Sequence, residues 1–166
     1  SGLQADCFSL DILSDETELD RTISQKCYNV SHIYYFCSPH IGSAPKGRFR
    51  NEVFMRFCDY YVSGFNKIFK ITANKGIKNY FYPSTVFLSE QPLNMGEYTA
   101  AKAAGESLCS LLSKSVEGIN IFNPRLPKLA TDQTVSLIGQ RIDSPDVIML
   151  NQLNQFHKLG RKNIYA

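Results

Sequence analysis

The sequence has no closely spaced pair of cysteines, no block of like charges and no long apolar run. Its five cysteines are odd in number and scattered, which argues against a zinc site or a disulfide framework and suits a reducing compartment. The net charge of +3 is dispersed, so a nucleic-acid partner is not expected. No apolar stretch approaches the roughly 18 residues of a membrane span. These absences predict a cytoplasmic protein with no nucleic-acid or membrane partner, and no histidine is assigned to a metal.

The sequence does contain a regular alternation of short apolar runs and helical patterns. Strands are expected at 7–13, 32–38, 78–88 and 118–123, with a last short strand at 162–166. Helices are expected at 14–27, 51–76, 96–114 and 144–160. Nearly continuous apolar strands that alternate with helices are typical of a parallel sheet covered on both faces. The prediction is a single α/β domain over residues 1–166, with a mostly parallel sheet of about four or five strands.

One candidate site stands in the segment GEYTAAKAAGE, residues 96–106, where Tyr98 is followed four residues later by Lys102. Helical spacing places the two side chains on one face, where their polar ends can share a ligand. A neighbouring ammonium would lower the pKa of the phenol from its usual value of about 10 and make it useful for proton transfer. The hydroxyls of Ser84 and Thr85 lie toward the end of the strand expected at 78–88, at the edge where parallel sheets bind ligands. The alternative interpretation is a plain solvated helix face.

The order STVFL…EYTAAKAAGE resembles the Ser…Tyr-x-x-x-Lys active-site segment of the short-chain dehydrogenases/reductases. Glu106, four residues after the lysine, is similar to the YxxxKxxxE form of the extended, NAD-dependent epimerase/dehydratase branch. VSGFNKIFKITANKGIKNYFYPSTVFL resembles the long helix and following strand of that branch, and INIFNPRLP resembles its later strand. The similarity spans about residues 6–127 in the right order. It implies a Rossmann-like fold with NAD or NADP as the cofactor.

The resemblance also implies roles for particular residues. The reaction would be a reversible hydride transfer at a carbonyl or alcohol carbon of a small-molecule or nucleotide-sugar-like substrate. Tyr98 would be the proton donor or acceptor, and Lys102 would lower its pKa and hold the ribose hydroxyls of the cofactor. Ser84, or else Thr85, would orient the substrate oxygen. The other residues that the resemblance assigns to the cofactor are Asp11 and Ile12 near the adenine, the turn residues Cys37 and Ser38, and Pro124 and Arg125 near the nicotinamide.

Three features depart from the pattern of that family. The family begins with a strand and a G-x-x-G-x-x-G turn that holds the pyrophosphate at a helix N-terminus, and this sequence has no such motif. Pro39 removes a backbone donor from the small-residue turn, and Tyr61 stands where the long helix usually has an asparagine. The chain is therefore expected to be the C-terminal majority of such a domain, as a piece of a longer protein or as a naturally shortened member. By itself it is expected to bind a dinucleotide poorly.

Other functions stay open at this point. A degenerate or shortened relative would act as a non-catalytic nucleotide-binding or interaction module. An unrelated doubly wound domain, of the flavodoxin-like or acyl-transfer kind, is less favoured because no G-x-S-x-G elbow or FMN phosphate loop is visible. The resemblance also implies a homodimer formed through the helices 49–75 or 97–114. The polar stretch 129–137 is either a surface connection or a segment that lines the substrate site.

Overall fold

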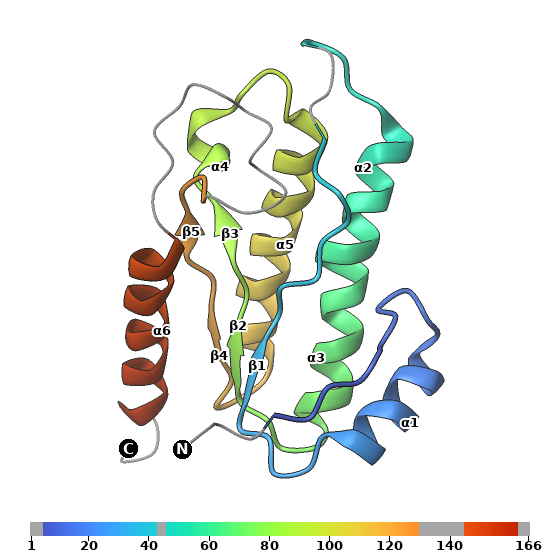
Figure 1. The fold of residues 1–166 in the computed structure, drawn as a ribbon, viewed down its shortest axis with the longest axis vertical. Helices are drawn as coiled ribbons and strands as arrows, with labels where there is room; N and C mark the ends of the chain where they lie inside the picture. Colours follow the sequence, from blue (N-terminus) through green and yellow to red (C-terminus); the bar gives the residue numbers. More distant parts are fainter. Residues whose placement is uncertain (1–4, 43–45, 130–144, 163–166) are drawn as a thin grey trace.

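A parallel β-sheet forms the centre of the computed structural model, which describes residues 5–42, 46–129 and 145–162 (Figure 1). The strands are β1 (His32–Tyr34), β2 (Asn79–Phe81) and β4 (Asn120–Phe122). They lie in the order β1-β2-β4, all parallel, and their register sets Tyr34, Phe81 and Phe122 side by side. The predicted α/β fold with a parallel sheet is confirmed.

A second strand pair continues the sheet toward its carboxyl edge. There β3 (Ser84–Thr85) pairs in parallel with β5 (Arg125–Leu126). The backbone N–H of Tyr82 donates to the Phe122 carbonyl at 2.9 Å, and that of Ser84 donates to the Pro124 carbonyl at 2.8 Å, so the ladder runs on between the two pairs. Pro83 and Pro124 have no N–H to donate, which interrupts the regular strand geometry at this point. The ends of β3 and β5 form the edge at which such sheets hold their ligands.

Helices cover both faces of the sheet, as predicted. Tyr80 and Tyr82 are fully buried on the face covered by α5 (Gly96–Ser115) and by the long helical stretch 51–73. Phe81 points to the opposite face, because alternate residues of a strand face opposite sides. There it contacts Phe156 of α6 (Pro145–Lys162), with the two ring centroids 5.7 Å apart. The sheet is therefore enclosed between α6 on one side and α3 (Phe65–Ala73) and α5 on the other (Figure 1).

The helix expected at 51–76 contains a wider turn in its middle. It consists of α2 (Asn51–Cys58), the π-helical segment η1 (Asp59–Gly64) and α3 (Phe65–Ala73). A π turn changes the usual bonding of the backbone and commonly occurs at functional sites. Here the Tyr35 hydroxyl donates to the Tyr60 carbonyl at 2.7 Å, and the Tyr82 hydroxyl donates to the Tyr61 carbonyl at 2.9 Å. Two tyrosines from strand ends thus bind carbonyls of the wide turn.

A glycine lies opposite each of these hydroxyls. A Cβ atom on Gly64 would come within 2.6 Å of the Tyr35 hydroxyl oxygen. A Cβ atom on Gly105, in α5, would overlap the Tyr82 hydroxyl and stand 2.9 Å from its Cζ. The close approach of α5 to η1 therefore depends on the missing side chain of Gly105.

Replacing Gly105 by alanine should lower the free energy of unfolding by about 2–4 kcal/mol, because the added methyl group pushes Tyr82 away from the Tyr61 carbonyl. Urea unfolding followed by circular dichroism measures this loss. Gly96→Ala is the matched control, since a Cβ at that end of α5 would meet only the Phe49 ring, at 3.6 Å. The control should be neutral or gain up to about 1 kcal/mol. Equal stability of the two variants would contradict the packing argument.

The prediction of a strand at 7–13 is wrong. The segment forms no strand, and at its end the Ser14 N–H donates to the Asp11 carbonyl in a turn, at 3.1 Å. Among the described residues, no strand pairs with this segment, so its backbone lacks the ladder partner that a strand requires. The helix that follows is confirmed as α1 (Glu16–Lys26), with the Asp15 carboxylate accepting from the Glu18 N–H at 2.9 Å.

The structure also corrects the bounds of the strands predicted at 32–38 and 78–88. Within 32–38 only the first three residues are a regular strand, and the end of 78–88 forms the short helix α4 (Phe87–Glu90). Residue 162 belongs to α6, while 163–166 and most of the stretch 129–137 lie outside the described residues. Within the described ranges, no helix has both the length and the apolar character that crossing a bilayer requires.

Candidate active site

Tyr98 lies in the first turns of α5, close to the carboxyl edge of the sheet. Its ring packs edge-on against Phe57, Tyr61 and Phe87, with centroid distances of 5.7, 5.8 and 6.3 Å. Burial raises the pKa of the Tyr98 phenol, and a hydrogen bond with the Thr85 side chain partly opposes that rise. The three aromatic rings therefore fix the position of the Tyr98 ring, while the Tyr98 hydroxyl is hydrogen-bonded to the Thr85 side chain at the end of β3.

Lys102 lies one helical turn after Tyr98 and is almost completely buried, with 7% of its surface exposed. Its ammonium donates to the Pro83 carbonyl at 2.7 Å and lies 4.0 Å from the centre of the Tyr61 ring and 5.1 Å from that of Tyr82. Burial lowers the pKa of Lys102 to about 7. The carbonyl and the two π faces are the main partners of a cation that has lost most of its water.

The expected electrostatic effect of Lys102 on Tyr98 does not occur in this structure. The pKa of Tyr98 is raised by burial, not lowered, and Lys102 is not among the groups that shift it. The physical reason is the direction of the amine, which is bound to the Pro83 carbonyl and covered by the Tyr61 ring. Helical spacing put the two residues on one face, but desolvation determines their protonation.

Ser84 is buried and belongs to a different cluster from Tyr98. Its hydroxyl donates to Glu106 Oε1 at 2.5 Å. Arg125 of β5 donates to both oxygens of the same carboxylate, from Nε at 2.9 Å and from Nη2 at 2.8 Å. Hydrogen bonding by Arg125 is the main cause that lowers the pKa of Glu106. Glu106, on α5, thus connects β3 and β5 to that helix. Its position four residues after Lys102 is visible in the sequence, but this connecting role was not predicted.

The structure brings some of the predicted cofactor residues to this edge and leaves others away from it. The Ser38 hydroxyl is 2.6 Å from the Tyr61 hydroxyl, and the Pro124 carbonyl accepts from β3. Asp11 uses its carboxylate to accept from the Leu13 N–H at 2.9 Å, within its own turn. Ile12 is buried in the core, where its Cγ1 approaches Gly64. Asp11, Ile12 and the exposed Cys37 have no described contact with Tyr98 or Lys102, and their roles toward the cofactor stay predictions.

The gathered groups fit a nicotinamide nucleotide only in part. A phenol, two hydroxyls and an amine at one sheet edge are suitable partners for a ribose and a carbonyl oxygen. The Tyr61 ring, however, covers the Lys102 ammonium, and the sequence has no glycine-rich turn for the pyrophosphate. Tyr61 was noted in the sequence only as a departure from an asparagine. Its contacts with Ser38, Tyr98 and Lys102 make it a central residue of the site.

No protein-family model matches the sequence, and no curated protein matches it. The fold is nevertheless that of the short-chain dehydrogenases. A short-chain dehydrogenase from Salmonella enterica serovar Typhi superposes with a TM-score of 0.72 over 90% of this chain and 68% of its own, at 13% identity. The oxidoreductase yciK from E. coli gives 0.72 over 87% and 65%, at 15% identity. An alcohol dehydrogenase from the archaeon Thermococcus sibiricus, complexed with 5-hydroxy-NADP, gives 0.70 over 88% and 66%, at 14% identity.

The chain spans about two thirds of the length of these structures. Identity this low shows the shared fold alone, so residue roles and activity come from the site itself.

Proposed function

We propose that the chain supplies the proton-transfer side of an NAD(P)-dependent oxidoreductase of the short-chain dehydrogenase/reductase type. The observation that supports this most is the Tyr98 phenol, held against the Thr85 hydroxyl at the carboxyl end of β3 with Lys102 one turn further along α5. The substrate is a carbonyl or alcohol compound, small or nucleotide-sugar-like. Glu106, four residues after Lys102, favours the extended epimerase/dehydratase branch.

In this proposal each residue has a separate task. The Tyr98 hydroxyl gives its proton to the substrate oxygen during reduction and takes it back during oxidation. Thr85 orients that oxygen, because the Ser84 hydroxyl is already bound to Glu106. The nicotinamide nucleotide, when bound, supplies or accepts the hydride. Lys102 lies over the face of the Tyr61 ring and Ser38 contacts the Tyr61 hydroxyl, so a ribose reaches the amine once the Tyr61 ring moves.

The experiment that tests this function uses the intact protein. NADH and NADPH are titrated by calorimetry, and nucleotide consumption is then followed with a panel of aldehydes, ketones and keto acids. We expect saturable binding of at least one nucleotide and consumption that depends on a carbonyl compound. Binding without consumption, over the whole panel and in both reaction directions, would contradict the oxidoreductase proposal.

A non-catalytic nucleotide-binding or interaction module is the second candidate. The observation that favours it is the Lys102 ammonium, which the Tyr61 ring covers. The same titration separates the two proposals, because a module of this kind binds nucleotide or a partner but turns over no carbonyl compound.

We also propose a cytoplasmic homodimer formed through the helices 49–75 or 97–114. Met55 on α2 and Leu111 on α5 support it, with 56% and 60% of their surfaces exposed. Light scattering on the intact protein tests this proposal, and a monomer at all concentrations would contradict it.

A further inference from the structure

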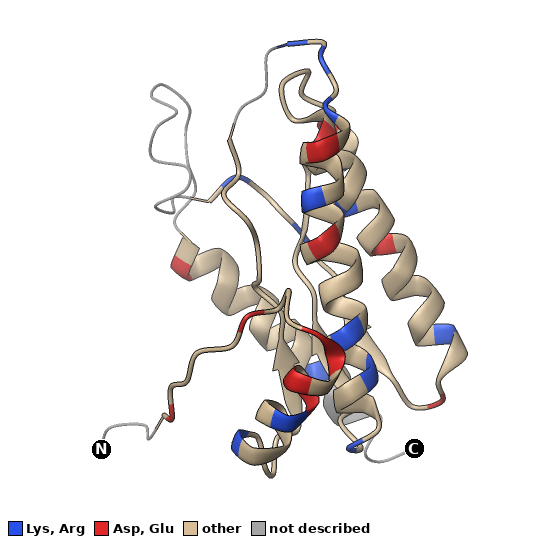
Figure 2. Cartoon of the chain, turned by 90° about the vertical axis from the view of Figure 1, so that its right-hand side faces the viewer, with Lys and Arg blue, Asp and Glu red and all other residues tan. Residues whose placement is uncertain are grey.

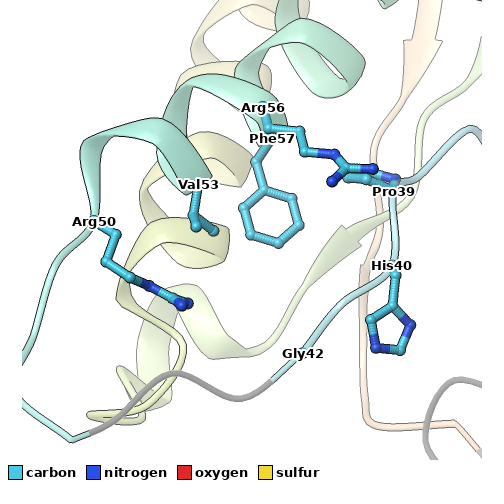
Figure 3. Close-up of a pocket in the computed structure, with 7 residues that line it drawn as sticks. All are labelled: Pro39, His40, Gly42, Arg50, Val53, Arg56 and Phe57. Atoms are coloured by element: carbon cyan, nitrogen blue, oxygen red, sulfur yellow. The ribbon is translucent and has the colours of Figure 1, made fainter.

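A hollow of about 220 Å³ opens beside the start of α2 (Figure 3). Pro39, His40 and Gly42, which follow β1, line one side of it. The other side comes from α2 and is lined by Arg50, Val53, Arg56 and Phe57. Figure 3 shows both arginines and the histidine around an apolar floor formed by Val53 and Phe57. The hollow therefore combines cationic and hydrogen-bonding groups at its rim with apolar side chains below.

The two arginines differ in whether a carboxylate of the protein already pairs with them. Arg50 donates its backbone N–H and its Nε to Oε1 of Glu97, at 3.0 and 3.2 Å. Glu97 is buried, with 2% of its surface exposed, so this pair fixes the Arg50 guanidinium, and Arg50 also lines the hollow. Arg56 forms no ion pair within the described ranges of the chain, although it lines the same hollow. The charge of Arg56 is thus not compensated.

Charges around the hollow are also mainly positive. The lining residues include Arg50 and Arg56 and no acidic residue, and Figure 2 shows further basic positions on the loop that leads into α2, which has the sequence KGRFR at 46–50 but lines the hollow only with Arg50. Glu52 and Asp59 belong to the same helical stretch, but neither lines the hollow. An anion that enters here would meet two guanidinium groups and no free carboxylate from the lining residues.

We propose that this hollow binds the carboxylate of a small organic acid. A guanidinium presents a planar pair of N–H donors that matches a carboxylate, and Arg56 is free to form such a pair. Arg50 and the His40 ring are further polar partners at the rim. Val53 and Phe57 receive the apolar body of the acid. The volume lies below the roughly 300–1,000 Å³ of pockets for drug-sized ligands, which suits a small acid.

The hollow adjoins the candidate active site through one shared side chain. Phe57 lines the hollow, and its ring also packs edge-on against Tyr98 at 5.7 Å. Binding of the acid depends only on the hollow, whereas the role of that acid as the substrate, with its carbonyl directed toward Tyr98, rests on the proposed function. A binding measurement without nicotinamide nucleotide therefore tests this inference separately.

The probe is 3-phenylpropionate, titrated into the full chain and followed by calorimetry and by amide chemical shifts. Its uncharged amide, 3-phenylpropionamide, has the same apolar body, and inorganic phosphate has charge without that body. We expect saturable binding of the acid, with shifts in residues 53–57, and at least tenfold weaker binding of the amide and of phosphate. No saturable binding of the acid, or equal affinity for phosphate or for the amide, would overturn the inference.

Variants locate the binding in the hollow. Arg56→Ala should weaken binding of 3-phenylpropionate about tenfold or more, and Arg56→Gln should do the same while retaining the packing of the side-chain stem. Arg21→Ala is the matched control, because it removes the same charge from an exposed position on α1, outside the hollow. An equal loss in Arg21→Ala, or unchanged affinity in both Arg56 variants when circular dichroism shows the wild-type fold, would overturn the inference.

Discussion

Replacing Tyr98 by phenylalanine in the intact protein should lower turnover by about a hundredfold to ten-thousandfold, the usual contribution of a positioned acid or base. The change removes the phenolic O–H that, in the proposed function, exchanges the proton, but it keeps the ring in contact with Phe57, Tyr61 and Phe87. Affinity for the nicotinamide nucleotide should therefore stay nearly unchanged. Steady-state kinetics at several pH values, with a calorimetric titration of the nucleotide, measure both quantities.

Tyr28→Phe is the matched control for this substitution. Tyr28 is 74% exposed and stands outside the site, so the loss of its hydroxyl should leave turnover unchanged. Thr85→Val should cause a smaller loss than Tyr98→Phe, since in the proposed function Thr85 orients the substrate oxygen and exchanges no proton. Turnover retained within a factor of about three in Tyr98→Phe would exclude this tyrosine as the acid or base.

Between about pH 7 and 9, the free energy of unfolding of the wild type should rise by about 2–3 kcal/mol relative to that of Lys102→Met. The pKa of Lys102 is about 7 in the folded chain, against a usual value of 10.5. Below pH 7 the amine is charged in both the folded and the unfolded chain. Above that pH, up to about 10.5, only the unfolded chain binds the proton, so raising the pH favours folding.

Urea unfolding of the two proteins at pH 7, 8 and 9 measures this difference directly. Burial also raises the pKa of Cys109, to about 12, but that thiol is present in both proteins and its effect cancels. Lys114→Met is the matched control, because it removes an exposed amine from the same helix and should leave the slope of the wild type unchanged. Parallel pH profiles for the wild type and Lys102→Met would show that the amine is hydrated, contrary to its burial.

The elements that could be predicted from the sequence are those set by neighbouring residues. Asp15 marks the start of α1, because a carboxylate there can accept from an N–H three residues later. The segment 96–114 has no proline and many small residues, and it forms α5 almost as expected. Tyr98 and Lys102 share a face for the same local reason, their spacing. Predictions of this kind need no knowledge of the remaining fold.

Other features depend on residues that are distant in the sequence. The wide turn η1 is stabilised by hydroxyls from Tyr35 and Tyr82, which no local pattern in 59–64 reveals. Ser84 and Thr85 are adjacent in sequence, and the positions of their partners on α5 decide their contacts. The Ser84 hydroxyl binds the Glu106 carboxylate, and the Thr85 hydroxyl is hydrogen-bonded to Tyr98. Strand 7–13 was predicted from its apolar residues, but a strand also requires a partner for its backbone.

In the π-helical segment each N–H reaches the carbonyl five residues earlier, one further than in an α-helix, so the segment takes up one extra residue. Deleting one residue between 59 and 63 would allow a regular α-helix, because five residues at about 100° each turn through nearly the same angle as six residues of the wider helix. Phe57 would keep its side toward Tyr98, and Phe65 its side toward Tyr82. The Tyr60 and Tyr61 carbonyls, however, would return to the regular ladder and turn away from the Tyr35 and Tyr82 hydroxyls, so the extra residue is a requirement of these two tyrosine contacts.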